Sequence, residues 1–194
     1  LGFPIHDYFI AKAIDQVRPG GVIAFVTSRY TMDKQSLDAR QYIAKRAELL
    51  GAIRLPNTAF KANAGTEVSA DILFFQKRDS MTKEMPEWVN LGSDANGITV
   101  NQYFADHPEM ILGEMKEVSG PYGMETTCMP IEGADLELQL AEAVKNIHGS
   151  MVYSLASGIF MEIWHLQLMW MQNWMMYQRV SRQIRMFVIT VMRL

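Results

Sequence analysis

"LLGAIRLPNTAFKANAGTEVSADILFFQKR" (residues 49–78) contains two apolar runs that predict strands, joined by a polar loop. The first run ends at Pro56, and the second occupies residues 68–78. The loop between them shows no helical pattern, whereas a parallel crossover normally contains a helix. We therefore expect the strand at residues 69–76 to run antiparallel to its neighbours.

Upstream of this stretch the chain alternates between helical and strand patterns. Residues 18–21 (RPGG) end a first helix, because Pro and Gly do not continue one. The run Val22–Val26 is almost continuously apolar, which is typical of a strand covered on both faces. Residues 36–49 return to helical spacing. The first helix is expected to bury the face that carries Ile5, Phe9, Ala13 and Val17.

The order helix, strand, helix, strand, loop, strand indicates an α/β fold. We expect Val22–Thr27 to lie next to Ser69–Gln76, with Ala52–Leu55 on the outer side. This unit occupies residues 1–79, and residues 80–149 form a polar connector followed by an amphipathic helix. In the connector, Trp88, Val89 and Leu91 predict a short strand, and a helix that begins near Asn101 is interrupted at Pro108. The amphipathic helix starts at Asp135 and presents one apolar face: Leu136, Leu140, Ala143, Val144 and Ile147.

Residues 150–194 form an atypical tail. Residues 151–194 hold 8 of the 15 Met and 3 of the 4 Trp, with no Pro, Asp or Lys. They show no sustained helical or strand period, so we assign the tail no fold. Our hypothesis is that the chain from about residue 150 onward is an out-of-frame translation, which the nucleotide sequence would test.

The charge and the composition of the chain exclude several kinds of site and of protein. The net charge is -3, with -6 in residues 1–150 and +3 in residues 151–194, and a mildly acidic body is not typical of proteins that bind nucleic acid non-specifically. Cys128 is the single cysteine, which excludes an intramolecular disulfide and a Cys-based zinc site. No window of 18 apolar residues predicts a membrane span. We expect a cytoplasmic protein that is cut from a longer one, since the first residues include no initiator Met.

The stretch from Arg18 to Asp79 resembles the second half of the catalytic domain of adenine-N6 DNA methyltransferases. The closest likeness is to the Asn-Pro-Pro-Phe/Tyr class of restriction-modification systems, and to methylase modules fused to Swi/Snf or DEAD-box helicases on bacterial mobile elements. The likeness covers roughly residues 5–148. It implies the second half of a Rossmann-like class I methyltransferase sheet with an antiparallel last strand, followed by a mostly helical extension.

Phe60 and Lys61 are the candidate site residues in the loop. In the family, an aromatic at the position of Phe60 packs against the target adenine after it is flipped from the duplex, and an aromatic wall replaces part of the lost stacking. Spacing alone favours a core role for Phe60. Lys61 is a candidate DNA phosphate contact, with a solvated surface lysine as the alternative.

Other candidates carry weaker patterns. His6 and Asp7 are adjacent on a helix and indicate a helix start rather than an acid/base pair. Ser28, Arg29 and Tyr30 end a strand on the side where α/β sheets bind ligands, with a polar strand exit as the favoured interpretation. The histidines show no metal-ligand spacing, so we predict no metal.

The family's S-adenosylmethionine motifs and its catalytic Asn-Pro-Pro-Phe motif do not occur in the chain. No catalytic or cofactor-binding residue is therefore predicted, and this fragment is expected to be inactive alone. The resemblance implies that the intact enzyme methylates a flipped adenine in double-stranded DNA, with S-adenosylmethionine as cofactor and the rest of the polypeptide as partner. The alternative is a non-catalytic DNA- or protein-docking module of a helicase-associated protein. Another doubly wound enzyme, such as a dehydrogenase, would need a Gly-rich turn that is not visible.

Overall fold

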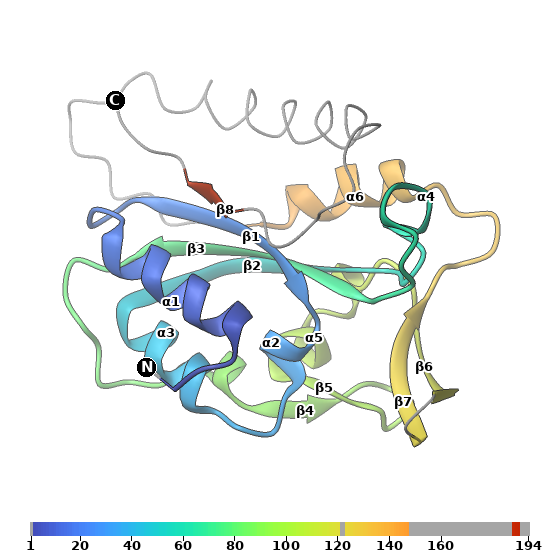
Figure 1. Cartoon of the computed structure of the whole chain (residues 1–194), viewed down its shortest axis with the longest axis horizontal. Helices are drawn as coiled ribbons and strands as arrows, with labels where there is room; N and C mark the ends of the chain where they lie inside the picture. Colours follow the sequence, from blue (N-terminus) through green and yellow to red (C-terminus); the bar gives the residue numbers. More distant parts are fainter. Residues whose placement is uncertain (1, 121–122, 148–187, 191–194) are drawn as a thin grey trace.

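The computed structural model describes residues 2–120, 123–147 and 188–190. Its centre is a four-stranded sheet in the order β2-β3-β1-β8 (Figure 1). β3 runs antiparallel to both β1 and β2, so β1 and β2 point in the same direction. The predicted order and the antiparallel third strand are confirmed. The strands are β1 (Val22–Ser28), β2 (Ala47–Leu55), β3 (Ala70–Lys77) and β8 (Val188–Thr190).

Helices cover both faces of this sheet, which makes the fold α/β. α1 (Ile5–Gln16) packs on β1 and on α3 (Asp38–Arg46), which leads directly into β2. α6 (Leu136–Lys145) contacts β2 from the opposite side (Figure 1). Strands covered on both faces are apolar along their whole length, which explains the nearly continuous hydrophobic runs in the sequence.

The segment after β3 adds short elements, and the predicted mostly helical extension is wrong. β4 pairs with β5 and β6 pairs with β7, both antiparallel. The elements are 3-10 turns at Glu87–Val89 and Pro108–Met110, β4 (Leu91–Ser93), β5 (Thr99–Asn101), α5 (Gln102–Asp106), β6 (Glu114–Gly120) and β7 (Gly123–Met129). The β6–β7 hairpin escaped prediction because it buries little beyond Met115 and Cys128, so its sequence shows no clear alternation.

One hydrophobic core joins both segments. Trp88, Phe104 and Leu140 pack in the same buried cluster as Phe25 and Ile53. The outer edge of β2 is also covered, since the Leu112 N–H donates to the Arg54 carbonyl at 2.9 Å. Residues on both sides of the predicted boundary at 79/80 therefore share one core, and the division into domains stays a prediction.

The face of α1 that the sequence predicted to be buried is covered only in part, because Ala13 and Val17 pack against the core and the other two predicted residues do not. Ile5 is 65% exposed and Phe9 is 42% exposed, whereas Ile10 and Ile14 are fully buried. Both faces of this helix are apolar, and packing selected the one that meets α3 and β1. The buried face includes Asp7, whose carboxylate pairs with Lys34.

Three local predictions differ from the structure. Trp88 and Val89 form a 3-10 turn rather than a strand, because both side chains are buried and adjacent strand residues would point to opposite faces. The helix predicted over residues 36–49 ends at Arg46, where β2 begins. The loop between β2 and β3 contains one helical turn, α4 (Lys61–Ala64).

As the second half of a methyltransferase sheet, the chain would leave the outer edge of β1 without a neighbouring strand. Instead, β8 pairs antiparallel with residues Ile23, Ala24 and Phe25 of β1. The remainder of the predicted tail, residues 150–187 and 191–194, lies outside the described residues. Among the described helices, none combines the length and the apolar character that crossing a membrane requires.

Candidate functional site

Most of the buried polar side chains gather where β1 and β2 end and β3 begins. Ligands bind at the carboxyl ends of the strands in open α/β sheets. Residues 28–33, which include the one-turn helix α2 (Tyr30–Asp33), and the loop at residues 57–69 form this end. We call these two segments the docking end.

Arg54 and Asp71 form the centre of the site. The antiparallel register places them directly opposite each other on β2 and β3. Arg54 Nε and Nη2 donate to the two oxygens of Asp71 at 2.8 and 2.9 Å, and both side chains are fully buried. The guanidinium also lies 4.2 Å from the ring centroid of Phe104. Burial opposes the charge of Arg54, but the attraction of Asp71 and Asp33 raises its pKa above the ordinary value.

Asp33 extends this pair into a network. Its carboxylate lies 2.8 Å from Arg54 Nη1 and 3.5 Å from Arg29 Nη1, and it accepts a hydrogen bond from the Asn101 backbone N–H at 2.9 Å. The Asn101 amide donates to the carbonyls of Met32 and Trp88 at 2.9 and 2.8 Å. We call Arg29, Asp33, Arg54, Asp71 and Asn101 the buried network.

The buried network is balanced in charge and closed to solvent. Two arginines face two carboxylates, and the central pair has no exposed surface. A substrate therefore does not reach Arg54 or Asp71 in this conformation. The network fixes the relative positions of α2, β2, β3 and β5 and does not present reacting groups.

Phe60 lies half-buried and packs against the core. It occupies the residue before α4, with φ of -110° and ψ of 5°. Both the predicted contact with a target base and the alternative core role are consistent with a half-buried ring. The role of Phe60 stays a prediction.

Lys61 is 61% exposed, and its ammonium lies 2.6 Å from Glu67 across the same loop. A surface ion pair of this kind contributes only about 0–1 kcal/mol. Lys61 is thus available for another anion, and its predicted contact with DNA stays a prediction.

Asn57 is a member of this end that the sequence interpretation missed. The side chain is 8% exposed, and its Nδ2 donates to the sulfur of Met129 at 3.6 Å. Its Oδ1 has no hydrogen-bond partner among the residues that the structure describes. Its position directly after Pro56, which ends the strand, could have indicated that Asn57 lies at the carboxyl end of the sheet.

Arg29 and Tyr30 form a stacked pair at the end of β1. The Arg29 guanidinium lies 4.4 Å from the Tyr30 ring centroid, and Tyr30 is 51% exposed. Arg29 itself is buried, and its backbone N–H donates to the Ser69 carbonyl at 3.2 Å. The segment is more than a polar strand exit, since it joins the buried network to an exposed aromatic ring.

Cys128 lies behind the docking end on β7. Its backbone N–H donates to Ser69 Oγ at 2.8 Å. Burial raises the pKa of the Cys128 thiol to about 12. The thiol therefore stays protonated near neutral pH and is not a nucleophile there.

The remaining candidates do not assemble into a site. Asp7 is buried against Lys34, which excludes it from an acid/base pair with the adjacent His6. Within the described residues, no group of His, Cys, Asp and Glu side chains is arranged to hold a metal ion.

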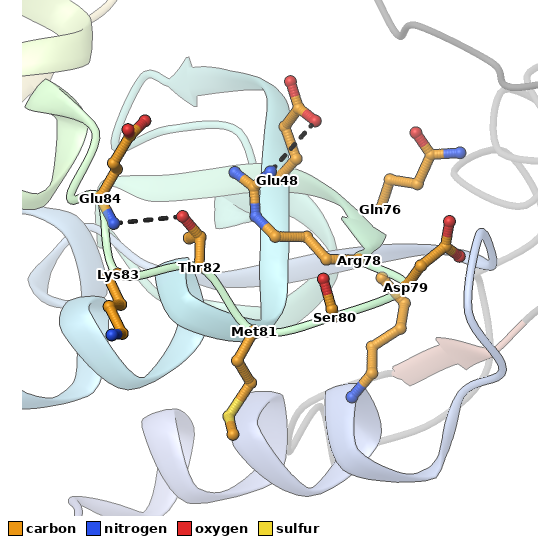
Figure 2. A pocket seen from close by; sticks show the side chains of 10 residues that line it. Glu48, Gln76, Arg78, Asp79, Ser80, Met81, Thr82, Lys83 and Glu84 are labelled. Atoms are coloured by element: carbon orange, nitrogen blue, oxygen red, sulfur yellow. Dashed lines mark hydrogen bonds and ion pairs between the residues drawn. The ribbon is translucent and has the colours of Figure 1, made fainter.

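The opposite end of the sheet holds a pocket of about 550 Å³. Figure 2 shows charged side chains of both signs around it, including Arg78, which lies 3.6 Å from Glu48. Its lining residues are Glu48, Gln76 and the segment 77–84. The charged lining residues are three basic ones and three acidic ones, so the lining carries no net charge: Lys77, Arg78, Lys83, Glu48, Asp79 and Glu84.

Comparisons with known proteins give one informative match. The chain is 28% identical over 115 residues to "Defense against restriction protein B" of Escherichia phage P1. The match covers 59% of this chain and 5% of the phage protein, so the chain spans about one twentieth of that relative's length. No family model matches the chain, and no solved structure matches it.

These findings overturn the predicted family. No family model supports an adenine-N6 DNA methyltransferase, and the matched relative is named for defence against restriction. The likeness in residues 18–79 rested on an ordered set of strands and one loop aromatic, and an α/β sheet with an antiparallel strand is not specific to that family. Adenine methylation and the use of S-adenosylmethionine by a longer protein are untested and stay predictions.

Proposed function

We propose that this chain is a non-catalytic docking module of a larger cytoplasmic protein that acts in defence against restriction, and that its docking end contacts DNA. The match to the phage P1 protein supports the process. Restriction cleaves DNA, so a protein that opposes it works where DNA is bound. The small share of the phage protein that matches supports a module rather than a complete enzyme.

The observation that carries the proposal is a pair of aromatic rings beside cations at one end of the sheet. Tyr30 is half exposed under Arg29, and the half-buried Phe60 is followed by the exposed Lys61. Bases stack on such rings with about 1–3 kcal/mol each. Lys61 is the exposed cation that contacts phosphate, whereas the buried Arg29 holds the Tyr30 ring in place. Aromatic rings interleaved with cations are typical of nucleic-acid contacts.

The buried network supplies a rigid base for this surface. Arg54 and Asp71 join the end of β2 to the start of β3, which are the two ends of the loop that carries Phe60. Asp33 joins α2, which carries Tyr30, to the same arginine. Anchoring both aromatic residues to one ionic network lowers the ordering cost when they bind.

The net charge of the chain indicates how tightly it should bind DNA. A net charge of -3 gives no long-range attraction to DNA. We expect a dissociation constant of about 10⁻⁴ M at physiological salt, the weak end of non-specific binding. We also expect a duplex with one unpaired base to bind more tightly than a perfect duplex, since extruding a paired base costs a few kcal/mol.

Fluorescence anisotropy with both labelled duplexes tests the proposal. Phe60→Ala and Tyr30→Ala should each weaken binding about 5- to 100-fold through lost stacking. Lys61→Ala should reduce the slope of log K against log salt by about 1. Tyr42→Ala is the matched control, because Tyr42 also stacks with an arginine, Arg46, at 3.6 Å, but on α3.

Two results would contradict the proposal. One is an absence of binding to either duplex at about 1 mM chain, well above the non-specific range. The other is a loss of affinity in Tyr42→Ala as large as in Tyr30→Ala, which would show that the docking end has no special role.

A further inference from the structure

α1 carries a second apolar stripe that nothing in the described structure covers. Ile5 is 65% exposed, Tyr8 is 37% exposed and Phe9 is 42% exposed. The spacing of i, i+3 and i+4 puts these three side chains on one side of the helix. Soluble surfaces carry single exposed hydrophobic residues, whereas contiguous ones mark an interaction site.

The stripe is fixed facing outward. On the opposite side of α1, Ile10, Ala11 and Ile14 are fully buried. Asp7 is buried as well and is held by its ion pair with Lys34. Turning the helix to bury Phe9 would expose this packed face and separate the ion pair, so a cover for the stripe has to come from outside the described residues.

We propose that the stripe formed by Ile5, Tyr8 and Phe9 docks an amphipathic helix from another part of the larger protein. A helix that is apolar on two sides is typical of one buried on two sides. Rows of side chains at i+3 and i+4 form ridges that fit the grooves of a second helix. The partner is thus a helix that lies along α1 with its own apolar stripe inward.

Charge specifies this partner further. Lys12 follows the stripe by one turn and is exposed, and it forms no ion pair with the residues that the structure describes. The partner helix therefore carries an acidic side chain beside its apolar stripe, opposite Lys12. Such a pair at the rim fixes orientation more than it adds affinity.

A second copy of this chain fits the stripe poorly. In an antiparallel pair of α1 helices centred between Tyr8 and Phe9, Lys12 of each copy would face Ile5 of the other. Each ammonium would then lie against an apolar side chain without a counter-ion, which is unfavourable. The phage P1 relative offers the alternative source, since 95% of its length lies outside the match.

The inference that the helix comes from the same larger protein rests on the proposed function. The stripe on α1 itself does not depend on whether the chain binds DNA. An array of overlapping 20-residue peptides that covers the phage P1 protein outside the match supplies the probes. The labelled 194-residue chain is expected to bind peptides with an apolar stripe and an acidic flank. Phe9→Glu should weaken that binding about 30-fold, as at an interface hot spot.

Leu138→Glu is the matched control, because Leu138 is 70% exposed on another helix, α6. It should leave peptide binding unchanged, and Phe9→Glu should leave DNA affinity unchanged. Circular dichroism melts of both variants show whether each is folded. A Lys12→Glu variant should weaken the same peptides and gain affinity for peptides with a basic flank.

Three outcomes would overturn the proposal. One is that no peptide binding is sensitive to Phe9→Glu in a folded variant. Another is that Leu138→Glu has the same effect as Phe9→Glu. The last is a dimer in light scattering that Phe9→Glu dissociates, which would assign the stripe to a second copy. DNA binding that persists in any of these cases would leave the proposed function standing.

Discussion

The two ends of the central sheet carry the same kinds of ionic groups in opposite environments. At the docking end, Arg54 and Asp71 are fully buried and bonded through two hydrogen bonds. At the pocket end, Arg78 and Glu48 are partly exposed and lie 3.6 Å apart (Figure 2). A buried charge that loses its partner is strongly destabilising, whereas an exposed pair contributes little. Burial, and not the residue types, therefore decides which end is rigid.

Rigidity at one end has a functional consequence. The buried network holds the strand ends from which the loop at residues 57–69 projects, and it anchors α2 to the same point. The pocket end relies on backbone hydrogen bonds such as that from the Thr82 N–H to the Lys45 carbonyl at 3.0 Å. A preorganised surface loses less entropy on binding, so the comparison favours the docking end as the place of recognition.

The largest expected effect comes from breaking the central pair. Arg54→Met should lower the free energy of unfolding by about 3–5 kcal/mol, because it leaves Asp71 and Asp33 buried without their cation. Arg78→Met at the pocket end should change it by less than about 1 kcal/mol. Urea denaturation of both variants gives the comparison, and equal effects would show that the two ends do not differ.

A smaller effect is expected at the periphery of the buried network. Asn101→Ala removes the donors to the Met32 and Trp88 carbonyls and the acceptor for the Tyr103 N–H. The free energy of unfolding should fall by about 2–3 kcal/mol, since buried carbonyls are left unpaired. Asn90→Ala, at an exposed position, is the control and should lie within about 0.5 kcal/mol of wild type. A tolerated Asn101→Ala would show that water replaces these bonds.

The effect that is smallest near neutral pH, and that appears only above pH 9.0, comes from the Cys128 thiol. Unfolding lowers the pKa of the Cys128 thiol from about 12 to its ordinary value of 9.0. Above pH 9.0 the unfolded chain releases this proton and the folded chain keeps it, so stability falls as pH rises. Relative to Cys128→Ala, wild type should lose about 1.4 kcal/mol per pH unit between these values. Parallel pH profiles in urea denaturation would show that the thiol ionises in the folded chain.

The strand directions were predictable from the sequence. The loop between β2 and β3 shows no helical pattern, whereas a parallel crossover normally contains a helix. The buried network was not predictable in the same way. Arg54 and Asp71 each interrupt an apolar run, and this was a usable signal, but their pairing depends on the register of two strands. A slip of one residue would place them on opposite faces.

In α1, tertiary packing determines which of the two apolar faces is buried. Ile5 and Phe9 fit a helical stripe as well as Ile10 and Ile14 do, and periodicity alone does not rank two apolar faces. The contact of Asp7 with Lys34, 27 residues away, selects the buried face. An acidic residue such as Asp7 is expected to face solvent, so the sequence did not identify the side of Ile10 and Ile14 as the most deeply buried one.

Hydrogen exchange measured by mass spectrometry, with and without DNA, tests the central claim most directly. We expect a duplex with one unpaired base to slow amide exchange in residues 28–33 and 57–69. Exchange in residues 78–84, which line the pocket at the other end, should not change. Protection confined to residues 78–84, or no protection at saturating DNA, would contradict the assignment of the docking end.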